Sequence, residues 1–146
     1  MADTDLIRLL LEAHRALGAE LVAGMEERGY PEARPAHSAV FMHIDRRSGT
    51  RLTELSRRAR MSKQGMMLIV DGLEEDGLVR RVPDPEDARA KIVRLTAKGR
   101  RFVAEARRTV AALESRARRE LGDRRYEALR SGLEELVGLQ GESVEG

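Results

Sequence analysis

The stretch from residue 51 to residue 100 limits the possible fold more than any other part of the chain. It begins with two short helical patterns separated by the tight break Met61-Ser62, and two short segments rich in β-branched residues follow. These segments, Leu78–Val82 and Lys91–Leu95, lie on either side of the bend-favouring sequence PDPEDARA. Because so short a break keeps the two helices from lying side by side, they must cross at a large angle. The stretch therefore predicts a helix-turn-helix followed by a β-hairpin with a projecting tip.

Capping residues set the expected limits of these two helices. Thr53 should cap the first, which would run through residue 60, and Ser62 should cap the second, over residues 63–76. Gly77 would end the second helix as its C′ residue. Spacings of three and four turn four apolar residues of the second helix inward, namely Met66, Ile69, Val70 and Leu73. Its outer arc then carries Lys63, Gln64, Met67, Leu68 and Asp71.

Further helical patterns lie on both sides of this stretch. Their apolar residues recur every three or four positions, as on one face of a helix. Such stripes serve either as core or as a subunit interface, and the two roles are compatible. The expected helices cover residues 4–28 with Thr4 as the cap, residues 37–45, residues 96–121, and residues after Gly122 with Asp123 as the cap, and the polar C-terminal GESVEG is expected to be frayed.

The charge of the chain is unevenly distributed, although its net value is only +2. Residues 46–108 contain 17 Lys and Arg against 9 Asp and Glu, whereas acidic residues outnumber basic ones in both flanking segments. A basic middle is the distribution expected of a protein that contacts phosphates, although a solvated helix surface can also produce it. Charge alone therefore suggests, without deciding, a nucleic-acid partner.

Several classes of site are disfavoured by the residues present. The absence of cysteine excludes a disulfide framework, a Cys-ligated zinc site and a thiol nucleophile, and it is compatible with a reducing cytoplasm. No two of His14, His37 and His43 are spaced as metal ligands on one helix, so we expect neither a metal nor a cofactor. The N-terminus resembles neither a signal peptide nor a membrane span. We therefore expect a cytoplasmic protein with no membrane partner.

Catalytic motifs are missing as well. The sequence contains no phosphate loop, no G-x-G-x-x-G, no H-E-x-x-H and no nucleophile elbow with a Ser-His-Asp set. Paired carboxylates such as Glu74-Glu75 lie on charged helix faces, where solvation is the simpler explanation for them. We therefore do not expect an enzyme.

The segments LTELSRRARMSKQ and VDGLEEDGLVRRVPDPEDARAKIVRLTAKG resemble the multiple-antibiotic-resistance regulator (MarR) family of winged helix-turn-helix regulators. The D-x-R element formed by Asp87 and Arg89, followed by LTAKG, is the most specific part of the match. The resemblance implies a mainly α fold with a small β-hairpin wing. It implies one domain over residues 1–146, with a DNA-binding lobe at about 37–100 and dimerisation helices at 1–30 and 101–140.

The resemblance also implies a function. Members of this family are homodimers that bind pseudo-palindromic operators in double-stranded DNA, commonly as repressors released by a small aromatic or phenolic effector. By resemblance, Arg89 enters the minor groove, Asp87 braces the wing through a salt bridge, and Ser62 opens the recognition helix. The expected DNA-binding residues are Ser62, Lys63, Gln64, Met67, Arg80, Arg81, Asp87, Arg89 and Lys91. The expected effector pocket, between the first, second and fifth helices, includes His14, Tyr30, His37 and Phe41.

Three alternatives remain open. Each of the four pocket residues can instead be an ordinary packed or surface residue. Met67 can contact a thymine methyl group, or it can pack with Leu68 on a neighbouring element, and in either case affinity is expected to depend mostly on the wing and its flanking arginines. Finally, the chain can be a helical dimeric protein-interaction module on a winged-helix scaffold with only weak or non-specific DNA binding. Such a module predicts no strong salt dependence of DNA binding.

Overall fold

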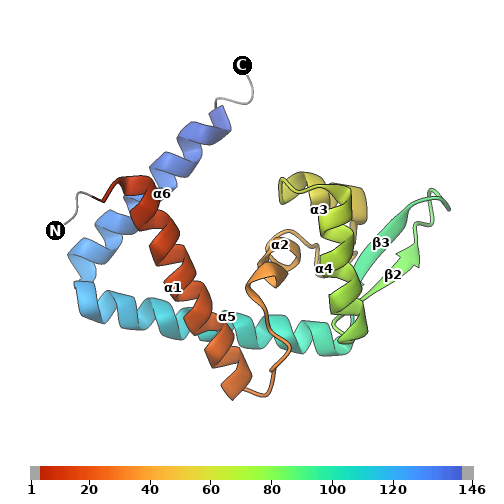
Figure 1. Cartoon of the computed structure of the whole chain (residues 1–146), viewed down its shortest axis with the longest axis horizontal. Helices are drawn as coiled ribbons and strands as arrows, with labels where there is room; N and C mark the ends of the chain where they lie inside the picture. The colour runs from red at the N-terminus through yellow and green to blue at the C-terminus, as the bar shows by residue number, and fades with distance from the viewer. Residues whose placement is uncertain (1–3, 143–146) are drawn as a thin grey trace. The chain divides into compact units, whose positions relative to one another are not determined.

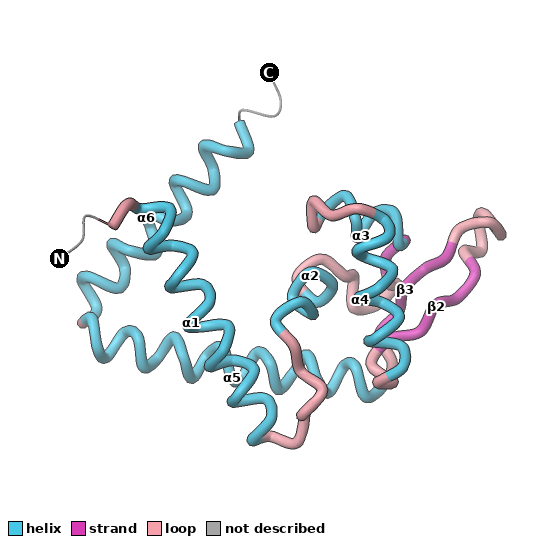
Figure 2. The backbone as a smooth tube through the Cα atoms, in the orientation of Figure 1, coloured by secondary structure: helices cyan, strands magenta, loops and turns pink. Residues whose placement is uncertain are grey.

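The computed structural model describes residues 4–142. These described residues divide into two compact units, one up to residue 109 and the other from residue 110 onward. The described part is mainly helical with one small sheet, which confirms the predicted fold class (Figures 1 and 2). In chain order the elements are α1 (Leu6–Glu27), the 3-10 helix η1 (Pro35–His37), α2 (Ser38–Phe41), β1 (Thr50–Arg51), α3 (Leu52–Arg58), α4 (Lys63–Glu75), β2 (Val79–Pro83), β3 (Lys91–Leu95), α5 (Ala97–Leu121) and α6 (Asp123–Glu142).

The sheet is antiparallel, in the order β1-β3-β2, and its β2–β3 hairpin forms a projecting wing (Figure 1). Val79 pairs with Leu95 at the base, and Asp84 donates its amide hydrogen to the Ala90 carbonyl at 3.0 Å to close the tip. The hairpin is therefore where the sequence predicted it, although β2 begins one residue later than expected. The shift arises because the Leu78 amide bonds instead to the Leu73 carbonyl at the end of α4, at 2.9 Å.

The core of the first unit is built mostly from aliphatic side chains. Burying each large one contributes roughly 1.5–3 kcal/mol to folding. On α4 the predicted inward face is confirmed, with Ile69 partly buried and the other three residues fully buried. The buried apolar residues are Met25, Ala33, Val40, Ile44, Leu55, Met66, Val70, Leu73, Leu78, Val79, Val93, Leu95, Phe102 and Val103.

Three of the predicted helix caps are wrong, and one of them is Asp123, which lies inside α6 as its first residue. Asp5, not Thr4, caps α1, because its Oδ1 accepts the Arg8 amide hydrogen at 2.8 Å. α3 begins at Leu52, directly after β1, so Thr53 lies inside its first turn rather than before it. Ser62 is the N-cap of α4 as predicted, and its Oγ accepts the Gly65 amide hydrogen at 3.0 Å.

The second predicted helix is also shorter than expected. Instead of residues 37–45, the structure has one 3-10 turn and the four-residue α2. Asp45 folds the chain back here, because its Oδ1 accepts the amide hydrogens of Arg47 and Ser48 at 2.9 and 2.8 Å. Such a local side-chain turn competes with continued helix.

The helix α1 keeps much of its apolar surface exposed. Met25 is its one buried residue among those described, and Leu21 packs partly against the core. The exposed large apolar residues of α1 are Leu6, Ile7, Leu9, Leu10, Leu11 and Leu17. The apolar stripe predicted for this helix therefore contributes to the core only near the C-terminal end of α1.

The second unit consists of the end of α5 and of α6. Gly122, with φ +80°, separates the two helices as predicted. Arg118 donates a hydrogen bond to Glu127 and lies over the Tyr126 ring, 4.4 Å from its centroid. Leu129, Leu136 and Val137 are exposed on α6.

None of the helices formed by residues 4–142 has the length and apolar character needed to cross a membrane. The C-terminal sequence GESVEG was predicted to fray. Its residues 143–146 lie outside the part of the chain that the structure describes.

Candidate nucleic-acid interface

The N-terminus of α4 is held by the turn that joins it to α3. Arg60 adopts a left-handed conformation with φ +54°, and the Met61 amide donates to the Ser56 carbonyl at 2.9 Å. The Ser62 cap then starts the helix, and Lys63 and Gln64 are exposed on its first turn. Because helix N-termini carry partial positive charge, this end of α4 suits contact with phosphates.

The outer face of α4 has an apolar middle. Met67 is 42% and Leu68 is 73% exposed, so neither is covered by another element of the chain. Asp71, one turn further on, is ion-paired with Arg81 of β2. The face therefore offers two polar side chains at its beginning and two apolar ones after them.

Arg81 links the wing to α4. Besides its ion pair with Asp71, its backbone amide donates to Oε2 of Glu74 at 2.9 Å. Its side chain is mostly covered, in contrast to that of its neighbour Arg80. Of these two predicted DNA-binding residues, Arg80 is thus the one with a free cationic group, whereas Arg81 fixes the wing against the helix.

Two arginines face each other across the wing. Arg80 of β2 lies directly opposite Arg94 of β3, and both are exposed. Arg94 also donates to the Arg47 carbonyl at 3.1 Å. Because like charges at directly opposed positions destabilise a sheet, this arrangement favours an anionic partner.

The tip of the wing is braced by Asp84, a residue that was not predicted to matter. Its side chain is only 5% exposed and forms a salt bridge with Arg51 of β1. Its Oδ1 also accepts the Glu86 amide hydrogen at 2.9 Å. These contacts, first the Glu86 amide and then Arg51, hold the pKa of the Asp84 carboxyl below its usual value. The position of this Asp before Pro in the tip sequence was the one available signal.

The predicted D-x-R pair lies at the outer end of the same tip. The Oδ1 atom of Asp87 accepts the Arg89 amide hydrogen at 3.0 Å and lies 3.6 Å from Arg89 Nε. The Arg89 side chain is 95% exposed, and Lys91 is exposed where β3 begins. The tip therefore projects a guanidinium into solvent from a turn fixed by carboxylates.

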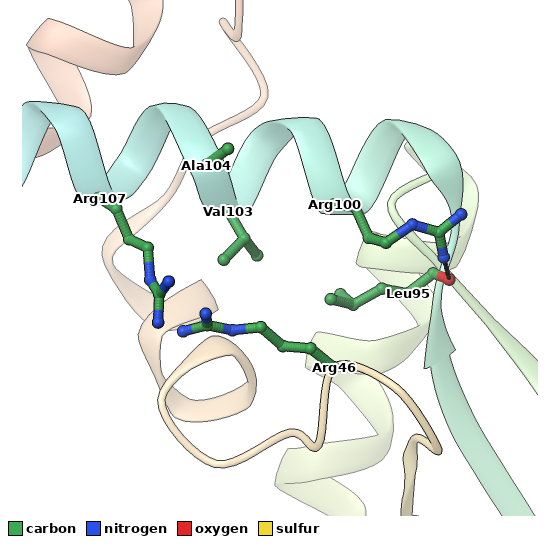
Figure 3. Close-up of a pocket in the computed structure, with 6 residues that line it drawn as sticks. All are labelled: Arg46, Leu95, Arg100, Val103, Ala104 and Arg107. Atoms are coloured by element: carbon green, nitrogen blue, oxygen red, sulfur yellow. Dashed lines mark hydrogen bonds between the residues drawn. The ribbon is translucent and has the colours of Figure 1, made fainter.

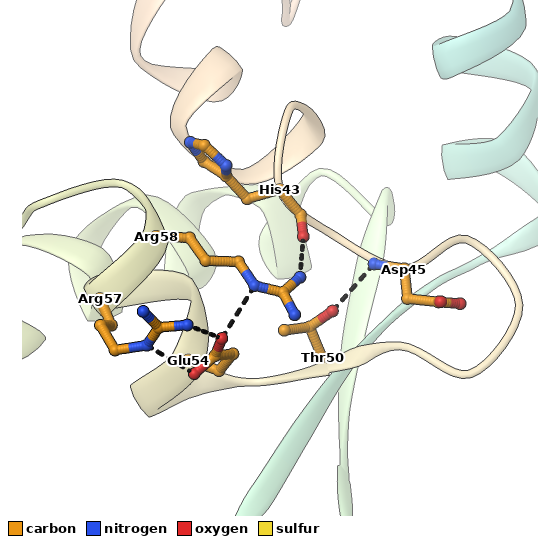
Figure 4. Close-up of polar contacts among 6 residues, drawn as sticks. All are labelled: His43, Asp45, Thr50, Glu54, Arg57 and Arg58. Carbon is orange, nitrogen blue, oxygen red and sulfur yellow. Dashed lines mark hydrogen bonds and ion pairs between the residues drawn. The ribbon is translucent and has the colours of Figure 1, made fainter. Parts of the chain in front are cut away.

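A polar network fixes α3 to the segment that follows α2 (Figure 4). Glu54 accepts hydrogen bonds from Arg57 and Arg58, and Arg58 also donates to the His43 carbonyl at 2.8 Å. The hydrogen bonds from Arg57 and then Arg58 lower the pKa of Glu54 to about 2. Near this network, the Asp45 amide donates to Thr50 Oγ1 at 2.8 Å. These contacts help fix the helix that precedes α4.

Comparison with known proteins places this arrangement in a family. Residues 34–90 match the model of the MarR family, and this segment contains α3, α4, β1, β2 and the wing tip. Residues 34–90 are a MarR-family segment. A comparison with functionally curated proteins found no match.

Solved structures with the MarR fold cover nearly the whole chain. The transcriptional repressor CouR, solved bound to a 23-mer DNA duplex, is 28% identical with a TM-score of 0.76, over 91% of this chain and 92% of CouR. CouR from Rhodococcus jostii RHA1, solved bound to p-coumaroyl-CoA, is 24% identical with a TM-score of 0.70, and the match covers 90% of this chain and 91% of that one. MarR itself is 24% identical with a TM-score of 0.73, and the match covers 97% of this chain and 96% of MarR. MarR-family proteins are transcription regulators, not enzymes.

Three of the four residues predicted for the effector pocket meet in an aromatic cluster. Ring centroids lie 5.3 Å apart for Tyr30 and Phe102, 5.0 Å for Phe41 and Phe102, and 6.2 Å for His37 and Phe41. His37 is buried, and this burial lowers its pKa. His14 is exposed on α1 and takes no part in these ring contacts. Tyr30, His37 and Phe41 therefore all pack around the Phe102 ring.

A groove that the sequence did not indicate lies beside α5 (Figure 3). It has a volume of about 300 Å³, with Leu95, Val103 and Ala104 as its apolar lining. Arg100 lies at one end, and the guanidinium groups of Arg46 and Arg107 point toward each other across it (Figure 3). No acidic side chain lines the groove, so it is suited to an anion with an apolar body. Among residues 4–142, no group of His, Asp and Glu side chains could hold a metal ion.

Proposed function

We propose that this chain is a sequence-specific regulator that binds double-stranded DNA as a homodimer and represses transcription until a small ligand releases it. The observation that carries the proposal is the wing, which Arg81 joins to α4 and which presents the exposed Arg89 at its tip, together with the exposed first turn of α4. The likeness to a repressor solved on a DNA duplex supports the same conclusion. Its DNA partner would place the protein in the cytoplasm.

Each element has a distinct role in the proposed complex. α4 enters the major groove, with Ser62, Lys63 and Gln64 nearest the bases and backbone. Arg89 enters the minor groove, where a permanent planar cation is favoured, and Asp87 orients it. Two other wing cations, Arg80 and Lys91, neutralise phosphates. Arg81 acts on DNA only indirectly, by holding the wing against α4 through Asp71.

A homodimer explains the exposed apolar surface of α1. Six exposed leucine and isoleucine side chains on one helix are more than a monomeric protein normally leaves in water. A two-fold axis would place two copies of α4 in successive major grooves, about 34 Å apart, and would require a pseudo-palindromic operator.

The effector is proposed to be a small aromatic or phenolic molecule, in line with the ligand-bound form of CouR. The groove beside α5 would hold its acidic group through Arg46 and Arg107. If the ligand favours a spacing of the recognition helices that DNA does not tolerate, ligand and DNA must weaken each other's binding equally. Paired titrations with p-coumarate as the probe test this coupling, and the absence of any mutual weakening would exclude it for this ligand.

The proposed function is tested by titrating the protein against duplexes selected from a random library and against random DNA. We expect tight binding to the selected duplex, a large preference over random DNA, and a steep fall in affinity between 50 and 200 mM salt. Equal affinity for selected and random DNA, with little salt dependence, would instead favour a protein-interaction module on a winged-helix scaffold.

A further inference from the structure

The outward face of α4 combines polar residues at its two ends with two apolar residues between them. Gln64, Met67, Leu68 and Asp71 are spaced as one helix face, because residues three and four apart lie next to each other. The carboxylate of Asp71 is occupied by Arg81 and is therefore not free to accept a hydrogen bond from a base. The middle of the face is apolar and exposed, with Leu68 at 73% and Met67 at 42%.

Neither of these apolar side chains serves the fold. The core packs on the opposite face of α4, through Met66, Val70 and Leu73, and neither Met67 nor Leu68 belongs to it or packs against it. Exposed apolar side chains on a functional face gain stability only when a partner covers them.

The charges around this face favour DNA as that partner. Lys63 is exposed at the start of the same helix, and Arg60 is exposed in the turn before it. In the major groove, the apolar feature of a base-pair edge is the C5 methyl group of thymine. We propose that Met67 and Leu68 of each protomer contact thymine methyl groups, so that methyl contacts carry a main part of the operator preference. This inference rests on the proposed function and specifies how its recognition helix discriminates between bases.

The test replaces single thymines by deoxyuridine in the duplex that the intact protein selects from a random library. This change removes the methyl group and leaves the Watson–Crick edge intact. At one or two positions in each half-site, we expect the wild-type affinity to fall about fourfold, the factor for losing one buried methyl group. The variants Leu68→Ala and Met67→Ala should bind the thymine duplex more weakly, and each should lose the sensitivity at one of these positions.

Two controls distinguish the loss of a methyl contact from unfolding and from the loss of any exposed apolar side chain. Alanine is at least as good a helix former as Met or Leu, so both variants should retain the wild-type melting temperature. Met42→Ala removes another exposed side chain, 77% accessible and outside α4, and should leave the deoxyuridine effect unchanged.

Two results would overturn the inference while leaving the proposed function intact. One is a selected duplex whose affinity is unchanged by deoxyuridine at every position, and the other is an undiminished deoxyuridine effect in both alanine variants. A change of oligomeric state in Leu68→Ala, without any methyl effect, would assign the face to a protein contact instead. If no duplex is selected at all, the proposed function itself fails, and the inference fails with it.

Discussion

Arg89 is the residue on which the proposed DNA contact depends most. Its side chain is 95% exposed, and it projects from a turn in which Asp87 and Asp84 each accept backbone amide hydrogens. A side chain presented in this way contributes little to folding, so its removal should affect binding alone.

We expect Arg89→Ala to weaken operator binding by about tenfold to a hundredfold, the range for losing hydrogen bonds from a charged donor. The slope of log affinity against log salt concentration should become shallower by about one. Arg124→Ala, at an exposed position on α6, is the matched control and should leave both quantities unchanged. Unchanged affinity and slope in Arg89→Ala would remove this residue from the interface.

Gly99 illustrates a close approach of backbone to backbone. A Cβ atom at this position would lie 1.9 Å from the Leu78 carbonyl oxygen, and the first turn of α5 cannot easily move away from the strand that it follows. We expect Gly99→Ala to lower the free energy of unfolding by at least about 2 kcal/mol, as overpacking does. Gly132→Ala in α6, where no atom lies within 4 Å of the new Cβ, should instead raise it by up to about 1 kcal/mol. Urea denaturation measures the free energy of unfolding of the two variants. The same change in this free energy for Gly99→Ala and Gly132→Ala would contradict this account.

At the residue scale, sequence reasoning found what is local and missed what is distant. The Ser62 cap and the pairing of Asp87 with Arg89 join residues three or fewer positions apart. The salt bridge between Arg51 and Asp84 joins residues 33 positions apart, and Gly99 meets Leu78 only once the hairpin has folded. No pattern of spacing in the sequence indicates such pairs.

At the scale of single elements, η1 holds the titratable group best placed to report on folding. His37 is buried at its end, and its Nδ1 accepts the Arg34 amide hydrogen at 3.3 Å, which requires the neutral ring. Burial is the main reason that its pKa lies below 6.5, and Arg34 acts in the same direction, whereas Asp76 and Glu32 oppose it.

The lowered pKa of His37 leads to a pH dependence of definite sign. Below pH 6.5 the unfolded chain binds a proton that the folded chain resists, so the free energy of unfolding falls as the pH decreases from 6.5 through the folded pKa. Urea denaturation between pH 8 and pH 5 should show this loss, and His37→Gln should reduce its slope. His14→Gln, at an exposed histidine, should not change the slope. An identical slope in wild type and His37→Gln would assign the effect elsewhere.

Element boundaries were predictable where a cap or break is unambiguous. Ser62, Gly77 and Gly122 mark ends that the structure confirms. The second helix was overextended because the pattern of apolar residues continues through Ile44, whereas the Asp45 turn ends the helical segment. Here local hydrogen bonding by one side chain outweighed the apolar periodicity.

For the whole molecule, the exposed face of α1 leads to the clearest expectation. If this face joins two protomers, Leu6→Glu combined with Leu10→Glu should convert a dimer into a monomer, because burying unpaired carboxylates is costly. Operator affinity should then fall by at least about a hundredfold, since each half-site would be bound alone. Sedimentation equilibrium and a DNA titration measure the two effects. A wild-type protein that is monomeric at micromolar concentration would contradict the homodimer directly.

The overall fold was open to prediction because its helix-turn-helix and hairpin are contiguous in sequence, with turn residues at each junction. The predicted division, a single domain with an inner DNA-binding lobe and outer dimerisation helices, stays a prediction. The groove beside α5 was beyond the reach of sequence, since Arg46 and Arg107 meet there from positions far apart along the chain.

The facing pair of Arg80 and Arg94 has a consequence for how association is driven. In the free protein, two opposed guanidiniums will attract small anions from the buffer, and a duplex carries its own layer of condensed cations. When the two surfaces meet, both sets of ions return to solution, so their entropy favours the complex. Calorimetry should therefore show DNA binding whose heat is small relative to its free energy. Replacing chloride by the weakly bound glutamate ion should strengthen the binding at equal ionic strength.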